Sequence, residues 1–259
     1  MPLNLDYLNH LNRHLSHNIH EMKGWCVPHL WQGLWPLVER IGLGSVAEIG
    51  VLEGKFLISL IKTFDPYNQY THAAIDVFDL QEFNIDNAGI GKAERLHANL
   101  KNQGVDPERT KKVRTDSLAL RQADASALVH RHGKFKFFSV DGCHDVTHTT
   151  HDIEFAMEVT DSAGIIAVDD YMNPNWPGVN EAVAKMYLLR NFAFIPLFFT
   201  CNKLFLCSAG YHQEYLELIQ AYIKHNHPET ELRPALRFGY NTLTIKPALS
   251  HWEPLKGLR

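Results

Sequence analysis

Two acidic sites follow buried hydrophobic runs in this sequence. Asp141 ends the run FFSVD, and Asp169 and Asp170 end the run GIIAVDD. Each run is typical of a parallel strand, and open α/β sheets bind their ligands in the crevice at the carboxyl ends of such strands. Carboxylates that meet there would bind a hard divalent metal or perturb each other's pKa strongly. The pattern indicates a functional site at this edge of a sheet.

His144 follows Asp141 in the same segment, VDGCH. Mg²⁺ prefers an octahedral shell of oxygen ligands and usually keeps positions for water or substrate oxygens. Such a metal would lower the pKa of a bound substrate hydroxyl, and an imidazole that titrates near neutral pH suits a general base. We expect Asp141, Asp169 and Asp170 to bind Mg²⁺ and His144 to act as the base. The alternative is that the acids cap a loop and the histidine packs against a strand.

A glycine turn precedes these sites in the segment EIGVLEG. Gly50 and Gly54 would let the backbone come close to a ligand where a side chain would clash. The spacing is GxxxG rather than GxGxxG, and Glu48 and Glu53 disfavour a pyrophosphate, which prefers helix N–H groups without nearby carboxylates. We therefore expect Glu48, Gly50 and Gly54 to bind a ligand with cationic or hydroxyl groups, such as S-adenosylmethionine. A tight turn with no ligand is the alternative.

Two further polar positions follow the glycine turn. Asp76 ends the run AAIDVF, at a position from which it would accept hydrogen bonds from ribose hydroxyls, and Asp79 is the fallback. Asp116 and Ser117 come after the next predicted strand, where they would meet the adenine edge. An aspartate at a strand end is also a common helix N-cap, so neither position taken alone is strong evidence for ligand binding. Their order after the glycine turn is what supports this assignment.

The elements that must position these residues alternate between strand and helix. We expect strands in SVAEIGV, THAAIDVF, KKVRTDS, FKFFSVDG and AGIIAVDD, and helices in GKFLISLIKTF, residues 91–103, SALVHRH, HTTHDIEFAMEV and VNEAVAKMYLL. FAFIPLFFT and KLFLCSA would form an antiparallel hairpin that turns at Asn202–Lys203. This order predicts an α/β, Rossmann-like, seven-stranded mixed sheet. The sheet would be mostly parallel with an antiparallel C-terminal hairpin, with helices on both faces and an N-terminal helical cap.

We divide the chain into three parts. Residues 1–44 would form a helical cap or lid, because Leu5, Leu8, Leu11 and Leu15 make one apolar stripe and a tryptophan-rich segment follows. Residues 45–210 would form the core that binds S-adenosylmethionine. Residues 211–259 would form a C-terminal helix, over 211–226, and a tail extension packed on the core.

Composition restricts the partners. The chain has 259 residues, of which 45% are apolar and 21% charged, and its formal net charge of −4 argues against nucleic acid and anionic membrane surfaces. We find no signal-peptide core and no membrane-spanning run. The four cysteines show no CxxC spacing, which suits reduced thiols in a cytosol. We expect a cytoplasmic protein that forms a homo-oligomer, with a dimer as the expected form.

Taken in order, EIGVLEG, IDVFD, RTDS, VDGCH, GIIAVDDY and PGVNEAV resemble the metal-dependent O-methyltransferases of the macrocin O-methyltransferase type, over roughly residues 45–208. In that group the acid of the DG motif and the two acids after strand five hold Mg²⁺, and the histidine three residues after the first acid serves as base in some members. The resemblance implies a class I, S-adenosylmethionine-dependent O-methyltransferase acting on a hydroxyl of a sugar or glycosylated small molecule. A cephalosporin-hydroxylase-type branch shares much of this pattern.

Other interpretations stay open. A dinucleotide-dependent oxidoreductase, a catechol-type O-methyltransferase or a non-catalytic binding protein would each fit the same fold. Tyr171, Asn173 and Trp176 would line the acceptor site, with Trp176 as a platform for a sugar ring, although packing is an equal alternative. Two histidine groups, His10, His14 and His17 and then His144, His148 and His151, each fall on one predicted helical face. We expect neither to bind zinc, because surface histidines are common and the nearby carboxylates favour a hard ion.

Overall fold

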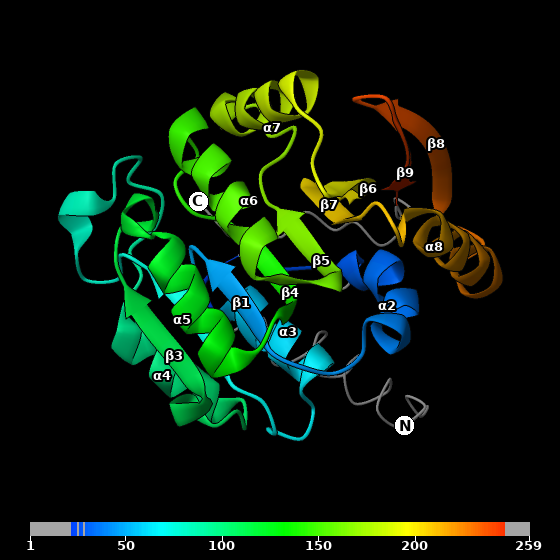
Figure 1. The fold of residues 1–259 in the computed structure, drawn as a ribbon. Helices are drawn as coiled ribbons and strands as arrows, with labels where there is room; N and C mark the ends of the chain where they lie inside the picture. The colour runs from blue at the N-terminus through cyan, green and yellow to red at the C-terminus, as the bar shows by residue number, and fades with distance from the viewer. Residues whose placement is uncertain (1–21, 25, 28, 247–259) are drawn as a thin grey trace.

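A computed structural model of the protein describes residues 22–246, apart from residues 25 and 28 (Figure 1). The predicted N-terminal leucine stripe and the histidines His10, His14 and His17 therefore lie outside the described residues, as does Trp25. The helix that follows, α2 (Leu30–Ile41), contains Pro36 and buries its apolar side against the core. Trp31 on this helix is buried and donates a hydrogen bond from Nε1 to Thr63 Oγ1, at 2.9 Å.

One mixed sheet forms the centre of the molecule (Figure 1). Its parallel part comprises β1 (Val46–Ile49), β2 (His72–Asp76), β3 (Thr110–Arg114), β4 (Phe135–Val140) and β5 (Thr160–Val168). The sheet continues through β6 (Phe194–Thr200), β7 (Lys203–Ser208), β8 (Glu231–Arg237) and β9 (Tyr240–Lys246). The spatial order is β3-β2-β1-β4-β5-β7-β6-β9-β8. β7 runs antiparallel to both β5 and β6, whereas β9 runs parallel to β6.

Helices cover both faces of the sheet (Figure 1). One apolar core contains residues of α2, α3 (Lys55–Phe64), α4 (Ala93–Asn102) and α8 (His212–Asn226). The core on the opposite face contains residues of α5 (Gln122–His132), α6 (Val146–Val159) and α7 (Pro177–Leu189). Short 3₁₀ turns occur at η2 (Gln81–Phe83), η3 (Pro107–Arg109) and η4 (Ser117–Ala119). Among the described residues, no helix is long and apolar enough to cross a membrane.

The local sequence explains the central elements. All four residues of β1 are buried, as expected for a strand that is covered on both faces. Helix α3 follows β1 and buries nearly its whole length, including Phe56, Leu57 and Leu60. Because consecutive strands point the same way, the loops after β1, β2, β4 and β5 all emerge at one edge of the sheet. That edge is where the candidate residues were predicted to meet.

The predicted fold class is confirmed, but the sheet has nine strands rather than seven. The two additional strands are the hairpin β8–β9, which was predicted only as a tail. β9 joins the sheet through Phe198↔Leu243 and Phe199↔Thr244. Pro234 interrupts the β8 pattern, and four of the seven residues of this strand are exposed while none is buried, which hides the usual alternation of a strand. The turn at Phe238–Gly239, with positive φ at both residues, is the signal that was missed.

The remaining boundary predictions differ little from the observed ones. The hairpin β6–β7 turns at Cys201–Asn202, one residue earlier than predicted, and both residues have positive φ. α8 covers almost the same residues as the predicted C-terminal helix. Cys26, Cys143, Cys201 and Cys207 are all free thiols. The division of the chain at residues 44 and 210 stays a prediction.

Candidate active site

The loops after β1, β2, β3, β4 and β5 enclose one cavity of about 460 Å³. Its walls come from segments far apart in the sequence, because the parallel strands all end at the same edge. The predicted site residues that line it are Gly50, Asp76, Asp116, Ser117, Asp141, His144, Asp169, Asp170 and Asn173. The long segment after β2 also lines it, through Gln81, Phe83, Asn84, Ile85, Asp86, Ala88, Gly89 and Gly91.

Gly50 brings the tips of β1 and β4 into close contact. Its φ is 79°, and a Cβ there would lie 1.7 Å from the carbonyl oxygen of Asp141. Glycine is therefore required at this position both for backbone conformation and for space. Gly54 has a φ of 87° and is the N-cap of α3, and a Cβ there would lie 2.3 Å from Cδ1 of Leu96.

Glu48 lies beneath the glycine turn, with 1% of its surface exposed. Its Oε2 accepts a hydrogen bond from the Leu57 backbone N–H in α3, at 3.1 Å. Burial raises the pKa of Glu48 to about 8, although nearby Lys203 acts in the opposite direction. Glu48 was expected to bind the ligand, but the structure places its carboxyl under the glycine turn, against the start of α3, and not in the cavity wall.

Asp76 stabilises the glycine turn through hydrogen bonds with its backbone. Its Oδ2 accepts hydrogen bonds from the backbone N–H groups of Val51, at 2.7 Å, and Leu52, at 2.9 Å. Its Oδ1 accepts a third, from the Phe78 N–H at 2.6 Å, and the residue lines the cavity. Asp79, the fallback, instead forms a half-exposed ion pair with Arg114, at 3.5 Å.

The predicted acidic cluster contains a lysine that the sequence reasoning missed. Lys203, at the start of β7, is fully buried and forms an ion pair with Asp169 Oδ2. Asp169 Oδ1 accepts the backbone N–H of Asp170, at 2.8 Å. Loss of solvent and the neighbouring Asp169 raise the pKa of Asp141 well above its usual range. The cluster therefore has an internal cation that compensates part of its negative charge.

His144 lies between two carboxylates. Its Nδ1 is 2.6 Å from Asp86 Oδ2, and its Nε2 is 3.0 Å from Asp170 Oδ2. Trp176 stacks on the imidazole, with ring centres 4.1 Å apart and planes inclined by 16°. Burial opposes protonation, but the hydrogen bonds with Asp170 and Asp86 outweigh it and raise the pKa of His144 to about 9. This differs from the near-neutral value expected from the sequence, because Asp86 was not foreseen.

Asp86 gave no signal in the sequence, since it lies in the irregular segment after η2 and not at a strand end. Its Oδ2 also accepts the backbone N–H of His144, at 3.0 Å. Although burial works in the opposite direction, the hydrogen bonds with His144 hold the pKa of Asp86 below its usual range. Asn202 in the β6–β7 turn was missed too, and it donates a hydrogen bond to Asp170 Oδ1 at 2.9 Å.

The three histidines predicted to share a helical face do not do so. α6 begins at Val146 with Asp145 as its N-cap, so His144 lies before the helix. His148 instead contacts Asp145 and Asp116, and His151 contacts Asp152 and the Leu120 carbonyl. The oxygen-rich group at the cavity is Asp141, His144 and Asp170, whose ligand atoms all lie within 4.8 Å of one another.

The predicted acceptor residues have three different environments. Asn173 lines the cavity and donates a hydrogen bond to Asp170 Oδ1, at 2.6 Å. Trp176 is partly buried against His144, so one face of its indole is already covered. Tyr171 is buried, packs edge-on against Phe199 with ring centres 5.7 Å apart, and is absent from the cavity wall.

Comparison with known proteins agrees with this geometry. Residues 47–171 match the family model described as a methyltransferase domain. The chain contains a methyltransferase domain. The prediction of a class I methyltransferase, made from the order of the motifs, is therefore confirmed. None of the curated proteins matches the sequence of this methyltransferase.

Solved structures share the fold of the methyltransferase. The O-methyltransferase NovP is 13% identical and has a TM-score of 0.55, with 78% of this chain and 98% of NovP covered. The calicheamicin methyltransferase CalS11 is 18% identical with a TM-score of 0.50, covering 80% of this chain and 93% of CalS11. MycE, in complex with Mg, S-adenosylhomocysteine and mycinamycin VI, is 17% identical with a TM-score of 0.50. The match covers 76% of the methyltransferase and 53% of MycE.

Proposed function

We propose that the protein is a Mg²⁺-dependent O-methyltransferase that transfers the methyl group of S-adenosylmethionine to a hydroxyl of a sugar or glycosylated small molecule. The observation that carries this proposal is that one cavity joins the glycine turn at Gly50 to the acids Asp141 and Asp170 and to His144. Donor and acceptor sites must adjoin, because methyl transfer requires the hydroxyl oxygen to approach the sulfonium methyl in line.

The donor would lie across the tips of β1, β2 and β3. Gly50 and Gly54 would form the donor turn, with Glu48 supporting it from β1 below. Asp76 would bind the ribose hydroxyls, and Asp116 and Ser117 would lie beside adenine. Asp76 already accepts three backbone N–H groups, so its carboxylate orientation is set before a ligand arrives. MycE, which shares the fold, was solved with S-adenosylhomocysteine, the product of such a reaction.

Asp141, Asp169 and Asp170 would hold the cation, as the sequence predicts. Carboxylate oxygens are the ligands that Mg²⁺ prefers, and the close grouping of Asp141 with Asp170 fits that preference. Asp169 already bonds Lys203 and the Asp170 backbone, so it would share an oxygen with the cation. When bound, Mg²⁺ supplies Lewis-acid stabilisation of a substrate oxygen as it loses its proton.

His144 would take that proton at Nε2. Asp86 contacts both Nδ1 and the backbone N–H of His144 through its Oδ2. These two contacts fix the imidazole ring and direct its Nε2 toward Asp170 and the cavity. The contact with Asp170 keeps a proton on Nε2, so the ring would first have to lose that proton before it could act as the base. Binding of Asp170 to the cation would remove this contact and so lower the pKa of His144. Trp176 covers one face of the imidazole and limits its rotation.

A carbohydrate-containing acceptor is supported by two proteins of the same fold. CalS11 is described as a calicheamicin methyltransferase, and MycE was solved with mycinamycin VI. Asn173 at the cavity wall, and Trp176 beside His144, would contact such an acceptor. A cytoplasmic location and a homo-oligomer, with a dimer as the expected form, stay predictions.

Transfer of a radiolabelled methyl group tests the proposal. The purified protein is incubated with labelled S-adenosylmethionine and a panel of deoxysugar nucleotides, glycosylated macrolides and catechols, with Mg²⁺ or with excess EDTA. We expect labelled product from a glycosylated acceptor only with Mg²⁺, and a loss of at least about 100-fold in Asp141→Asn. Full turnover in EDTA would refute the metal role, and transfer only to catechols would refute the acceptor class.

A further inference from the structure

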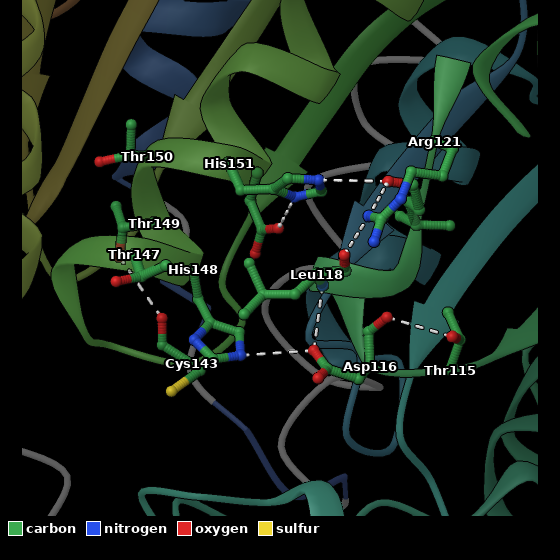
Figure 2. Close-up of polar contacts among 12 residues, drawn as sticks. Thr115, Asp116, Leu118, Arg121, Cys143, Thr147, His148, Thr149, Thr150 and His151 are labelled. Carbon is green, nitrogen blue, oxygen red and sulfur yellow. Dashed lines mark hydrogen bonds and ion pairs between the residues drawn. The ribbon is translucent and has the colours of Figure 1, made fainter. Parts of the chain in front are cut away.

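His148 connects α6 to the segment that is expected to contact adenine (Figure 2). Its Nε2 lies 3.3 Å from Asp116 Oδ1, and its Nδ1 lies 2.7 Å from Asp145 Oδ2. The side chain is buried, with 3% of the residue exposed, and it lines the cavity together with Asp116 and Ser117. The proposed mechanism of methyl transfer does not use this histidine.

The position of His148 is fixed from its own helix. Asp145 is the N-cap of α6, and its Oδ1 accepts the backbone N–H groups of Thr147, at 2.7 Å, and His148, at 2.9 Å. Its Oδ2 is left for the His148 ring. Both ring nitrogens therefore face carboxylate oxygens, which only accept hydrogen bonds when ionised, so each contact is strongest with N–H on that nitrogen.

The two carboxylate oxygens of Asp116 differ in their hydrogen-bond partners. Oδ1 accepts the Leu118 backbone N–H, at 3.0 Å, and also faces His148 Nε2 (Figure 2). With both donors on Oδ1, the carboxylate is held in one orientation and Oδ2 is directed away from them. About a quarter of the Asp116 side chain, 24%, is exposed, and the residue lines the cavity. Oδ2 is thus the oxygen available to a ligand.

An ionised carboxylate oxygen recognises an N–H donor and rejects an acceptor. The edge of adenine offers an amino group at position 6, whereas hypoxanthine offers a carbonyl oxygen there. We propose that His148 is a positioning residue that holds Asp116 so that its Oδ2 selects a 6-amino purine over a 6-oxo purine. This inference rests on the proposed function, since it takes S-adenosylmethionine to be the donor.

A neighbouring residue provides a matched control. His151 lies one turn further along α6, and its Nε2 is 3.3 Å from the carbonyl oxygen of Leu120, in the segment that Asp116 begins. Its Nδ1 is 3.2 Å from Asp152 Oδ1. His151 therefore supports the same segment from the same helix without touching Asp116. His151→Leu removes the contact with the Leu120 carbonyl. His148→Leu instead removes the contact with the Asp116 carboxylate, which would select the purine.

The experiment measures the affinity of the full chain for S-adenosylhomocysteine and for S-inosylhomocysteine by isothermal titration calorimetry. We expect the wild type to prefer the adenosyl ligand by at least about 100-fold, because a carboxylate oxygen that faces a carbonyl oxygen across the bound base has no donor to pair with. His148→Leu should lower that ratio by about tenfold, the usual effect of losing one charge-assisted hydrogen bond. His148→Gln, whose amide can still donate to Asp116, should recover most of the ratio. His151→Leu should weaken both ligands equally.

The possible failures are distinguishable. If His148→Leu melts normally and keeps the wild-type ratio of adenosyl to inosyl affinity, the proposed role of His148 is wrong. The assignment of the donor site would remain intact. If His148→Leu does not fold, His148→Gln and Asp116→Asn decide the matter. The asparagine amide can donate to a 6-oxo group, so Asp116→Asn should favour the inosyl ligand, and an unchanged preference contradicts the proposal. A wild type that binds neither ligand would refute the proposed function itself.

Discussion

Lys203 and Asp169 form an ion pair in which the lysine is fully buried and the aspartate side chain is 5% exposed. The residues beside this pair are also in contact, since Asn202, which precedes Lys203, donates a hydrogen bond to Asp170 Oδ1 at 2.9 Å. The β6–β7 turn therefore holds both members of the acidic pair that follows β5. The ammonium group also lies over the Phe56 ring, 4.5 Å from its centre, and the nearby acids raise the pKa of Lys203 although burial opposes this.

The first prediction concerns this ion pair. Lys203→Met should lower the free energy of unfolding by about 3–5 kcal/mol, because it leaves an unpaired carboxylate in the protein interior. Urea denaturation measures the loss. Arg190→Met, which removes the exposed pair between Arg190 and Glu154, serves as control and should cost less than about 1 kcal/mol. Equal losses in the two variants would show that the buried lysine does not compensate the cluster.

The second prediction concerns Asp86 as the residue that orients His144. Asp86→Asn should lower kcat by about 10- to 100-fold while the affinity for S-adenosylhomocysteine stays within about twofold, because a general base works only when its ring is correctly placed. Asp79→Asn, in the same segment but paired with Arg114 at the surface, should leave kcat unchanged. An Asp86 variant with full kcat would mean that the contact between Asp86 and His144 is only structural.

The third prediction separates backbone strain from steric conflict at Gly50. Gly42 has a similar φ, 82°, but a Cβ there would have no heavy atom within 4 Å. With its ψ of 165°, Gly42 has a backbone conformation that almost only glycine adopts, so Gly42→Ala should cost about 1–3 kcal/mol from backbone strain alone. Gly50→Ala adds a conflict with the Asp141 carbonyl, so it should destabilise the chain well beyond that and weaken S-adenosylhomocysteine binding. Similar unfolding energies for the two variants would contradict the close approach of β1 and β4.

The fourth prediction concerns acid stability. Burial lowers the pKa of His132 from 6.5 to about 4, although its hydrogen bond with Thr71 acts in the opposite direction. The unfolded state then binds a proton more readily than the folded state. The stabilisation from neutral His132 is fully present above pH 6.5 and is lost as the pH falls toward 4.

His132→Asn keeps a group that can bond Thr71 but removes the titration. Between pH 7 and pH 5 the wild type should lose about 2 kcal/mol more stability than this variant, measured by urea denaturation at each pH. Identical pH profiles would show that His132 is not held neutral in the folded state.

The sequence was sufficient to locate the strand ends and the residues that follow them. Asp141 and Asp169 each come directly after a run of buried apolar residues, and parallel strands place such positions at one edge of the sheet. The glycine turn was equally predictable, because Gly50 lies between a buried strand and a helix. Both predictions use patterns within short segments of sequence, together with the rule that consecutive parallel strands end at the same edge of the sheet.

What the sequence did not predict are contacts between distant segments. Asp86 reaches His144 from an irregular segment that has no periodic pattern, and the side chains in such a segment are placed by tertiary packing. Lys203 is the first residue of a buried strand and adjoins the turn at Cys201–Asn202, so the sequence pattern predicts a turn residue there rather than an inward-facing lysine. The β8–β9 hairpin was missed because a proline and an exposed face interrupt its alternation.

A crystal structure with S-adenosylhomocysteine and Mn²⁺, an anomalous scatterer that replaces Mg²⁺, tests the central claim most directly. We predict that the ligand lies across the Gly50 turn with its adenine beside Asp116, and that a Mn²⁺ peak contacts the carboxylates of Asp141 and Asp170. Adenine density elsewhere in the molecule, or no anomalous peak at these two acids in fully occupied crystals, would contradict the account.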